Sequence, residues 1–127
     1  MSAEHIQPSG LPTPPTYSHV VRCGNTVYLA GQTAQNERGE VIGQGDVTAQ
    51  AEQVFANLGK CLASVGGDFS NLVKITVYVC DARYRESVAA VRAKYLKPPL
   101  PASTFIVVAG LANPDYMLEI EGIAVID

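Results

Sequence analysis

The fold is decided by one stretch of the chain, residues 72–80, with the sequence LVKITVYVC. Apolar and more polar side chains alternate along this stretch. The apolar set consists of Val73, Ile75, Val77 and Val79. Because successive side chains of a β-strand point to opposite faces, the alternation predicts a strand with one face buried against a core.

A helix pattern lies on each side of this strand. Before it, apolar residues recur every three or four positions over about 46–65, where Asp46 is placed to cap the first turn. After it, Asp81 can cap a second helix, which Pro98-Pro99 stops. We therefore expect two helices, separated in sequence by one strand.

Further strands are expected at both ends of the chain. The segments 17–23 and 26–30 form a predicted hairpin, and 102–109 and 117–125 are strands near the C-terminus. Residues 1–16 are rich in proline, and we expect an irregular arm there. This order of elements predicts one α+β domain over 1–127, with a mixed sheet that carries both helices on a single face.

The composition indicates a domain with surface to bury. Of the 127 residues, 47% are hydrophobic and only 17% are charged, and the net charge is −3. The charged fraction lies below the ~25% that is typical of soluble domains. Because helices on one side leave the other face of the sheet open, we expect that face to pack against further copies of the chain.

The same composition excludes several functional classes. A pI near 5.3 and scattered basic residues provide no stripe for nucleic acid, and no apolar run approaches the ~20 residues of a membrane span. The polar N-terminus lacks a signal-peptide pattern, so we expect a cytoplasmic protein. Cys23, Cys61 and Cys80 are widely spaced, so we expect no metal site and ordinary buried or half-buried cysteines.

Short motifs spread over nearly the whole chain point to one family. They are Pro15-Thr16-Tyr17-Ser18, Leu29-Ala30-Gly31-Gln32, Ala49-Gln50-Ala51, the strand stretch 72–79, Pro101-Ala102-Ser103-Thr104 and the segment 119–125 (EIEGIAV). Each motif is short, but their order and spacing together resemble the Rid (YjgF/YER057c/UK114) family.

This resemblance implies both a fold and an activity. The fold would be chorismate-mutase-like, in a homotrimer whose sheets form a central barrel with clefts between neighbouring subunits. The activity would be the hydrolysis of enamines and imines, such as 2-aminoacrylate, to keto acids and ammonia, without any cofactor. The partners would accordingly be a small-molecule substrate and further copies of the chain, with neither nucleic acid nor a membrane.

The chain departs from the deaminating branch of this family at positions expected to face the ligand. In that branch an arginine stands at the position of Ser103 and holds the substrate carboxylate in a bidentate pair. Its serine, cysteine and asparagine are replaced here by Ala30, Phe105 and Ala89. These substitutions imply a ligand that is larger, more apolar or differently charged than a short imino acid.

Another cation could replace the missing arginine. Arg22 is the first choice, because it lies next to a strand that the resemblance places at the cleft. Arg83, Arg85 and Arg92, on or near the second helix, are the alternatives. Each of these side chains can equally be an ordinary solvated one.

The resemblance also assigns residues to the cleft. Glu121 is the expected catalytic residue, which would activate or orient a water, whereas Glu119 is expected to be solvated. The substrate-binding residues would be Tyr17, Ala30, Gly31, Ser103, Thr104 and Phe105. His19 follows Tyr17 by two positions and is either structural or an acid/base near the cleft.

Three functions remain open, two of them catalytic and one not. The first is a cofactor-free hydrolase or deaminase that acts on a small enamine, imine or related conjugated acid, rather than on 2-aminoacrylate. The second is a non-catalytic trimer that binds metabolites or acts as a chaperone, which the loss of the arginine favours. A third, tautomerisation or hydration in the same cleft, fits the residues as well as the first.

Overall fold

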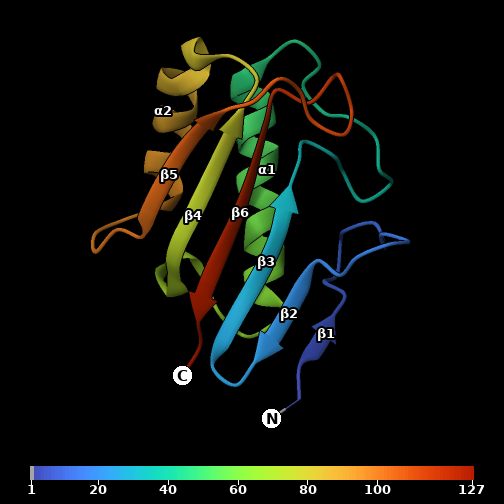
Figure 1. Cartoon of the computed structure of the whole chain (residues 1–127), viewed down its shortest axis with the longest axis vertical. Helices are drawn as coiled ribbons and strands as arrows, with labels where there is room; N and C mark the ends of the chain where they lie inside the picture. Colours follow the sequence, from blue (N-terminus) through green and yellow to red (C-terminus); the bar gives the residue numbers. More distant parts are fainter. Residues whose placement is uncertain (1) are drawn as a thin grey trace.

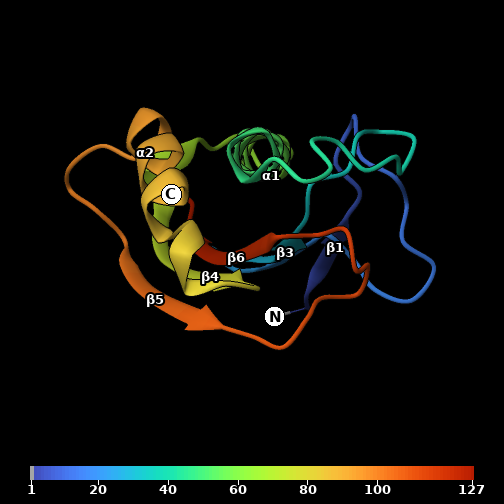
Figure 2. The same ribbon diagram turned by 90° about the horizontal axis from the view of Figure 1, so that it is seen from above.

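The computed structural model describes residues 2–127, which form one six-stranded mixed sheet covered on one face by two α-helices (Figures 1 and 2). The strands are β1 (Glu4–Ile6), β2 (Val20–Cys23), β3 (Thr26–Gln32), β4 (Leu72–Val79), β5 (Ala102–Val107) and β6 (Leu118–Val125). The helices are α1 (Val47–Ala63) and α2 (Arg85–Tyr95), with short 3-10 turns at Phe69–Asn71 and Ala82–Tyr84. The predicted α+β architecture is confirmed.

The order of the strands explains why the sheet is mixed. Across the sheet they follow the order β1-β2-β3-β6-β4-β5. The chain leaves β4, forms α2 and returns as β5, so that β4 and β5 run parallel while the other neighbours pair antiparallel. A parallel pair needs a long crossover, and α2 provides it. One edge of the sheet is therefore formed by β5 and α2 together.

Helix α1 covers the centre of the sheet. The side chain of Asp46 accepts a hydrogen bond from the backbone N–H of Ala49, which confirms the predicted cap. The buried face of α1 includes Val54, Phe55, Leu58 and Leu62. These side chains pack against buried residues of β4 and β6, and burying each such apolar side chain contributes about 1.5–3 kcal/mol.

Three expectations are corrected by the structure. Residues 4–6 of the supposedly irregular arm form β1, which pairs with β2. Val73 is 46% exposed, because the register of β4 against β6 shifts between Leu72 and Lys74 and Leu72 takes the buried place. Cys23 is exposed rather than buried, although Cys61 is buried and Cys80 half-buried as expected.

The face of the sheet opposite the helices is open in the single chain, as Figure 2 shows. Large side chains stand on it, including Tyr28, Ile106 and Val125, and Tyr28 is 51% exposed. Polar groups stand on the same face, because Tyr78 of β4 reaches Glu121 of β6. This face is where the candidate residues of β3 and β6 lie.

Candidate functional site

The first group of candidate residues lies where β3 and β6 meet. The register of these strands shifts between Leu29 and Gln32, so Ala30 and Gly31 sit in an irregularity of β3. Glu119 of β6 lies directly against Gly31, because a Cβ added at position 31 would collide with the Glu119 carboxylate. Glycine at position 31 therefore permits the close approach of a carboxylate to the strand.

Tyr17 completes this group, and we call Tyr17, Gly31 and Glu119 the Glu119 cluster. Partial burial and the negative charge of Glu119 raise the pKa of Tyr17. The pKa of Glu119 is also raised, first by burial and then by the charge of Glu121. A raised pKa brings a carboxyl group closer to the pH range in which it can both take and return a proton.

Glu121 lies on the same face but has different neighbours. The hydroxyl of Tyr78 donates a hydrogen bond to its Oε2 atom over 3.1 Å. Partial desolvation and this bond raise the pKa of Tyr78. Glu121 and Ala30 line the same hollow, of about 370 Å³. The structure thus brings Glu121 near Ala30, whereas it is Glu119 that lies against Gly31 and beside Tyr17.

His19 holds the N-terminal arm to β3. The Nε2 of Gln32 donates to His19 Nδ1 over 3.0 Å, and this leaves His19 Nε2–H to donate to the carbonyl of Pro12 over 2.8 Å. The imidazole is only 1% exposed, and its ring lies edge-on to Tyr17 with centroids 5.8 Å apart. Both nitrogens are engaged, so His19 positions Tyr17 and is not free to act as an acid or base.

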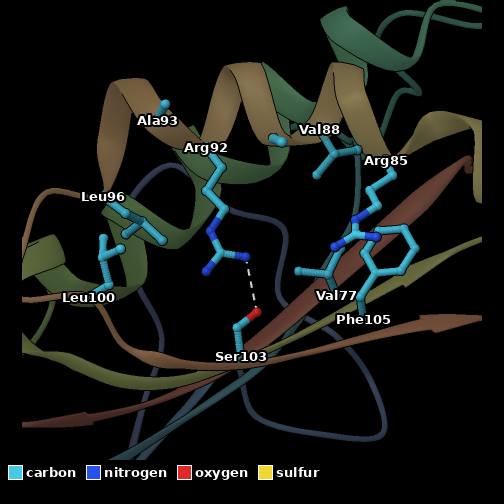
Figure 3. A pocket seen from close by; sticks show the side chains of 10 residues that line it. Val77, Arg85, Val88, Arg92, Ala93, Leu96, Leu100, Ser103 and Phe105 are labelled. Carbon is cyan, nitrogen blue, oxygen red and sulfur yellow. Dashed lines mark hydrogen bonds between the residues drawn. The ribbon is translucent and has the colours of Figure 1, made fainter.

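The second group of candidate residues lines a cavity of about 650 Å³ between α2 and β5, shown in Figure 3, which we call the α2–β5 pocket. Ser103 and Phe105 point into it from β5, and Ala89 lies on the α2 side. Most of the remaining wall is apolar and includes Val77, Val88, Leu96 and Leu100.

Two guanidinium groups face this pocket from α2. Arg92 Nη1 donates to Ser103 Oγ over 3.0 Å, as the dashed line in Figure 3 marks. The guanidinium of Arg85 lies over the ring of Phe105, 5.7 Å from its centroid, which is a cation–π contact. Within residues 2–127, the salt bridges involve neither of these arginines.

The side chain of Thr104 points to the opposite face of β5 from the side chains of Ser103 and Phe105. Its hydroxyl bonds to Lys74 Nζ over 2.6 Å, and Lys74 lines the hollow on the open face. Successive residues of β5 point to opposite faces. The predicted binding motif of β5 is therefore divided between the two faces of the sheet.

Comparison with known proteins identifies the family. Residues 10–126 match the family described as Endoribonuclease L-PSP. The chain belongs to this family, which is the Rid family. It is 35% identical over 109 residues to the mouse 2-iminobutanoate/2-iminopropanoate deaminase, covering 86% of this chain and 80% of the relative. It is 32% identical over 111 residues to the deaminase of the same name from Dermatophagoides farinae, covering 87% and 86%.

Solved structures of Rid proteins agree with this fold. The crystal structure of RidA from an Antarctic Psychrobacter species superposes with a TM-score of 0.90 at 34% identity, covering 97% of this chain and 99% of that one. The arrangement of two helices on one face of a mixed sheet is therefore shared across the whole length of the two chains.

The arginines of this Rid protein are placed differently from the first expectation. Arg22 lies in neither hollow, and its Nε donates to the carbonyl of Gly24 over 2.9 Å. Arg85 and Arg92 lie in the pocket that Ser103 lines. The sequence signal for them is their spacing of seven residues, which puts both on one face of α2.

Within residues 2–127, no helix combines the length and apolarity that crossing a bilayer would require. Over the same residues, no three His, Cys, Asp or Glu side chains gather in a way that could hold a metal ion.

Proposed function

We propose that this Rid protein is a cofactor-free hydrolase of 2-imino or enamine acids, which converts the C=N carbon to a keto group and releases ammonia. The observation that carries the proposal is the Glu119 carboxylate seated against Gly31, whose negative charge also helps to raise the pKa of Tyr17. The names of the relatives, 2-iminobutanoate/2-iminopropanoate deaminases, support the same reaction class.

The proposed reaction needs a positioned water and a group that exchanges protons. Water adds to the imine carbon while Glu119 takes one of its protons. Glu119 passes this proton to nitrogen, which gives a carbinolamine. It then takes the proton of the new hydroxyl group and passes it to nitrogen as the carbonyl forms and the C–N bond breaks, so that nitrogen leaves as ammonia. Burial raises the pKa of Glu119, which brings the carboxyl closer to the pH at which it can both accept and donate.

In this proposal Glu119 takes the role that the sequence suggested for Glu121. Glu121 remains close, and its charge contributes to the raised pKa of Glu119. Its hydrogen bond from Tyr78 fixes the carboxylate away from Gly31. Glu121 would therefore tune Glu119 rather than touch the reacting atoms.

The proposed site is completed by a second copy of the chain. The Glu119 cluster and the α2–β5 pocket lie on different faces of the sheet, so a ligand on one chain does not meet both. The open face, with Tyr28, Ile106 and Val125, supports packing between copies. We propose a homotrimer in which the cluster of one subunit faces the pocket of the next.

The proposed ligand is a small acid rather than RNA, despite the word endoribonuclease in the family's description. The net charge of −3 is unfavourable for binding a phosphate backbone. The pocket of about 650 Å³ is within the usual range for a small molecule.

The proposal can be tested by generating 2-imino acids in situ with an amino acid oxidase and following ammonia release. We expect release faster than the spontaneous hydrolysis, from a protein that sediments as a trimer. If the trimer binds 2-oxo acids but accelerates no imine, the non-catalytic metabolite-binding function is favoured instead. A monomer with full activity would contradict the site between subunits.

A further inference from the structure

The two guanidinium groups of the α2–β5 pocket share one face of one helix. Arg85 and Arg92 are seven residues apart, about two turns or 10 Å along the axis of α2. They reach the same cavity from above, whereas Ser103 and Phe105 approach from β5 below (Figure 3). The positive charge of this pocket thus comes from the helix and not from the strand.

Arg92 retains capacity to bind an anion. A guanidinium carries five N–H donors, and the bond to Ser103 Oγ uses one of them. Ser103 accepts that bond through its oxygen, so its own O–H remains a donor. Within residues 2–127 no carboxylate neutralises Arg92 in a salt bridge. Arg92 and Ser103 together therefore offer converging donors of the kind that carboxylates bind.

The remainder of the pocket is suited to an apolar group. Val88, Leu96 and Phe105 form walls, and Leu100 is 60% exposed beside them. The guanidinium of Arg85 lies over the Phe105 ring, 5.7 Å from its centroid, and so supports that wall. Covering these side chains removes apolar surface from water, which favours ligands with a sizeable hydrocarbon part.

We propose that Arg92, oriented by Ser103, is the carboxylate anchor of this protein, and that the substrates are 2-imino acids with branched or aromatic side chains. The assignment of the reaction rests on the proposed function, but the binding of the acid does not. In the deaminating branch the anchoring arginine is expected on β5, at the position of Ser103. Here the anchor stands on α2, and the β5 side of the pocket carries only a serine. The space of one guanidinium is thus available to the side chain of the ligand.

The binding test uses stable 2-oxo acids in place of the imines. Calorimetry would compare 4-methyl-2-oxopentanoate, 2-oxobutanoate and the methyl ester of the first. We expect 4-methyl-2-oxopentanoate to bind at least about 10-fold more tightly than 2-oxobutanoate, given its two extra carbons. The ester lacks the charge and should bind about 10- to 100-fold more weakly than its acid.

Variants assign this binding to Arg92. Arg92→Gln should weaken the binding of 4-methyl-2-oxopentanoate about 10- to 100-fold, and Arg92→Lys should recover only part of it, because an ammonium cannot make the bidentate pair. Arg83→Gln is the matched control, since the exposed Arg83 is paired with Asp81 outside the pocket. It should leave the dissociation constant unchanged.

A double variant keeps the test decisive if Arg92→Gln disturbs folding. Arg92→Ser with Ser103→Arg moves the guanidinium from helix to strand. It should restore binding of 2-oxobutanoate but not of 4-methyl-2-oxopentanoate. Equal binding of both acids in the original protein, or no binding of either, would overturn the inference.

Kinetics and binding of Arg92→Gln separate the role of the anchor from that of the hydrolase. Deamination whose KM is unchanged in Arg92→Gln would leave the hydrolase in place and overturn the anchor. Binding of the acid that depends on Arg92, without acceleration of any imine, would uphold the anchor and contradict the hydrolase.

Discussion

The Glu119 cluster presents a carboxylate against a glycine on the open face of the sheet, whereas the α2–β5 pocket presents two guanidiniums against an apolar wall under a helix. The cluster depends on close packing between two central strands, and small changes there move the carboxylate. The pocket lies at the edge of the sheet, where side chains can change with less effect on the fold. We therefore expect the Glu119 cluster to determine the reaction and the α2–β5 pocket to determine which ligand binds.

The contrast in charge has a consequence for the ligand. A carboxylate substrate is repelled by Glu119 and attracted by Arg92, so its acid group should point toward the pocket and its C=N carbon toward the cluster. Substitutions in the cluster should therefore change kcat, and substitutions in the pocket should change KM.

The largest expected effect is that of Glu119→Gln. Removal of the proton-exchanging group should lower kcat about 100- to 10,000-fold with little change in KM. The measurement is steady-state deamination of imines generated in situ. Glu121→Gln is the matched control and should lower kcat by less than about 10-fold, since Glu121 is proposed to act only through Glu119. The opposite ranking would return the catalytic role to Glu121.

The next effect is that of Gly31→Ala. The added Cβ would meet the end of the Glu119 side chain, which can move aside, so the fold should survive. The displaced carboxylate should lower kcat about 100-fold, as misplacements of about 1 Å do. Gly110→Ala is the control, because a Cβ there meets nothing within 4 Å. Equal kcat values for the two variants would contradict the role given to Gly31.

A smaller effect is expected in the pocket from Phe105→Ala. Loss of the ring removes part of the apolar wall and the surface on which Arg85 rests. We expect KM for the imine of leucine to rise about 10-fold, with kcat within about 2-fold of the original. Kinetics with the imines of leucine and of 2-aminobutyrate check this expectation. A fall in kcat with KM unchanged would argue that the pocket takes part in the chemistry.

The smallest effect concerns stability and pH. The folded protein raises the pKa of Glu119 above its ordinary value of 4.5. The folded state thus holds this proton more tightly than the unfolded state, and this contribution to stability is lost as pH rises through the raised pKa. Glu119→Gln should therefore have a higher Tm than the original protein at pH 7. The difference should shrink as pH falls through the raised pKa and be absent below about 4, which thermal scans would show. A lower Tm of Glu119→Gln than of the original protein at pH 7 would contradict the conclusion that burial of the ionised carboxylate destabilises the folded state.

Much of the fold could be predicted because it is encoded locally. The alternation over 72–80 predicted β4, and the apolar spacing after Asp46 predicted α1. By contrast, β1 is only three residues long, and its strand conformation depends on pairing with β2 rather than on a local sequence pattern. Val73 followed the alternation in sequence, but the irregularity beside Leu72 moved it to the surface.

The candidate site was predicted less well, because it depends on pairing between strands. Glu119 and Glu121 lie on the same face of β6, so alternation cannot decide which of them meets Gly31. The register shift in β3 decides it. Similarly, Arg22 lies only five residues after Tyr17 in the sequence, whereas Arg92 reaches Ser103 only because α2 returns over β5.

The position of β5 has a consequence for the motions of the pocket. Within residues 2–127, β5 is hydrogen-bonded in the sheet to β4 alone, and five of its six residues are exposed, all but Phe105. Strands with few buried contacts open locally at low free-energy cost. The floor of the pocket is therefore an edge strand that can open locally, and amide exchange in β5 should slow when an acid bridges it to α2.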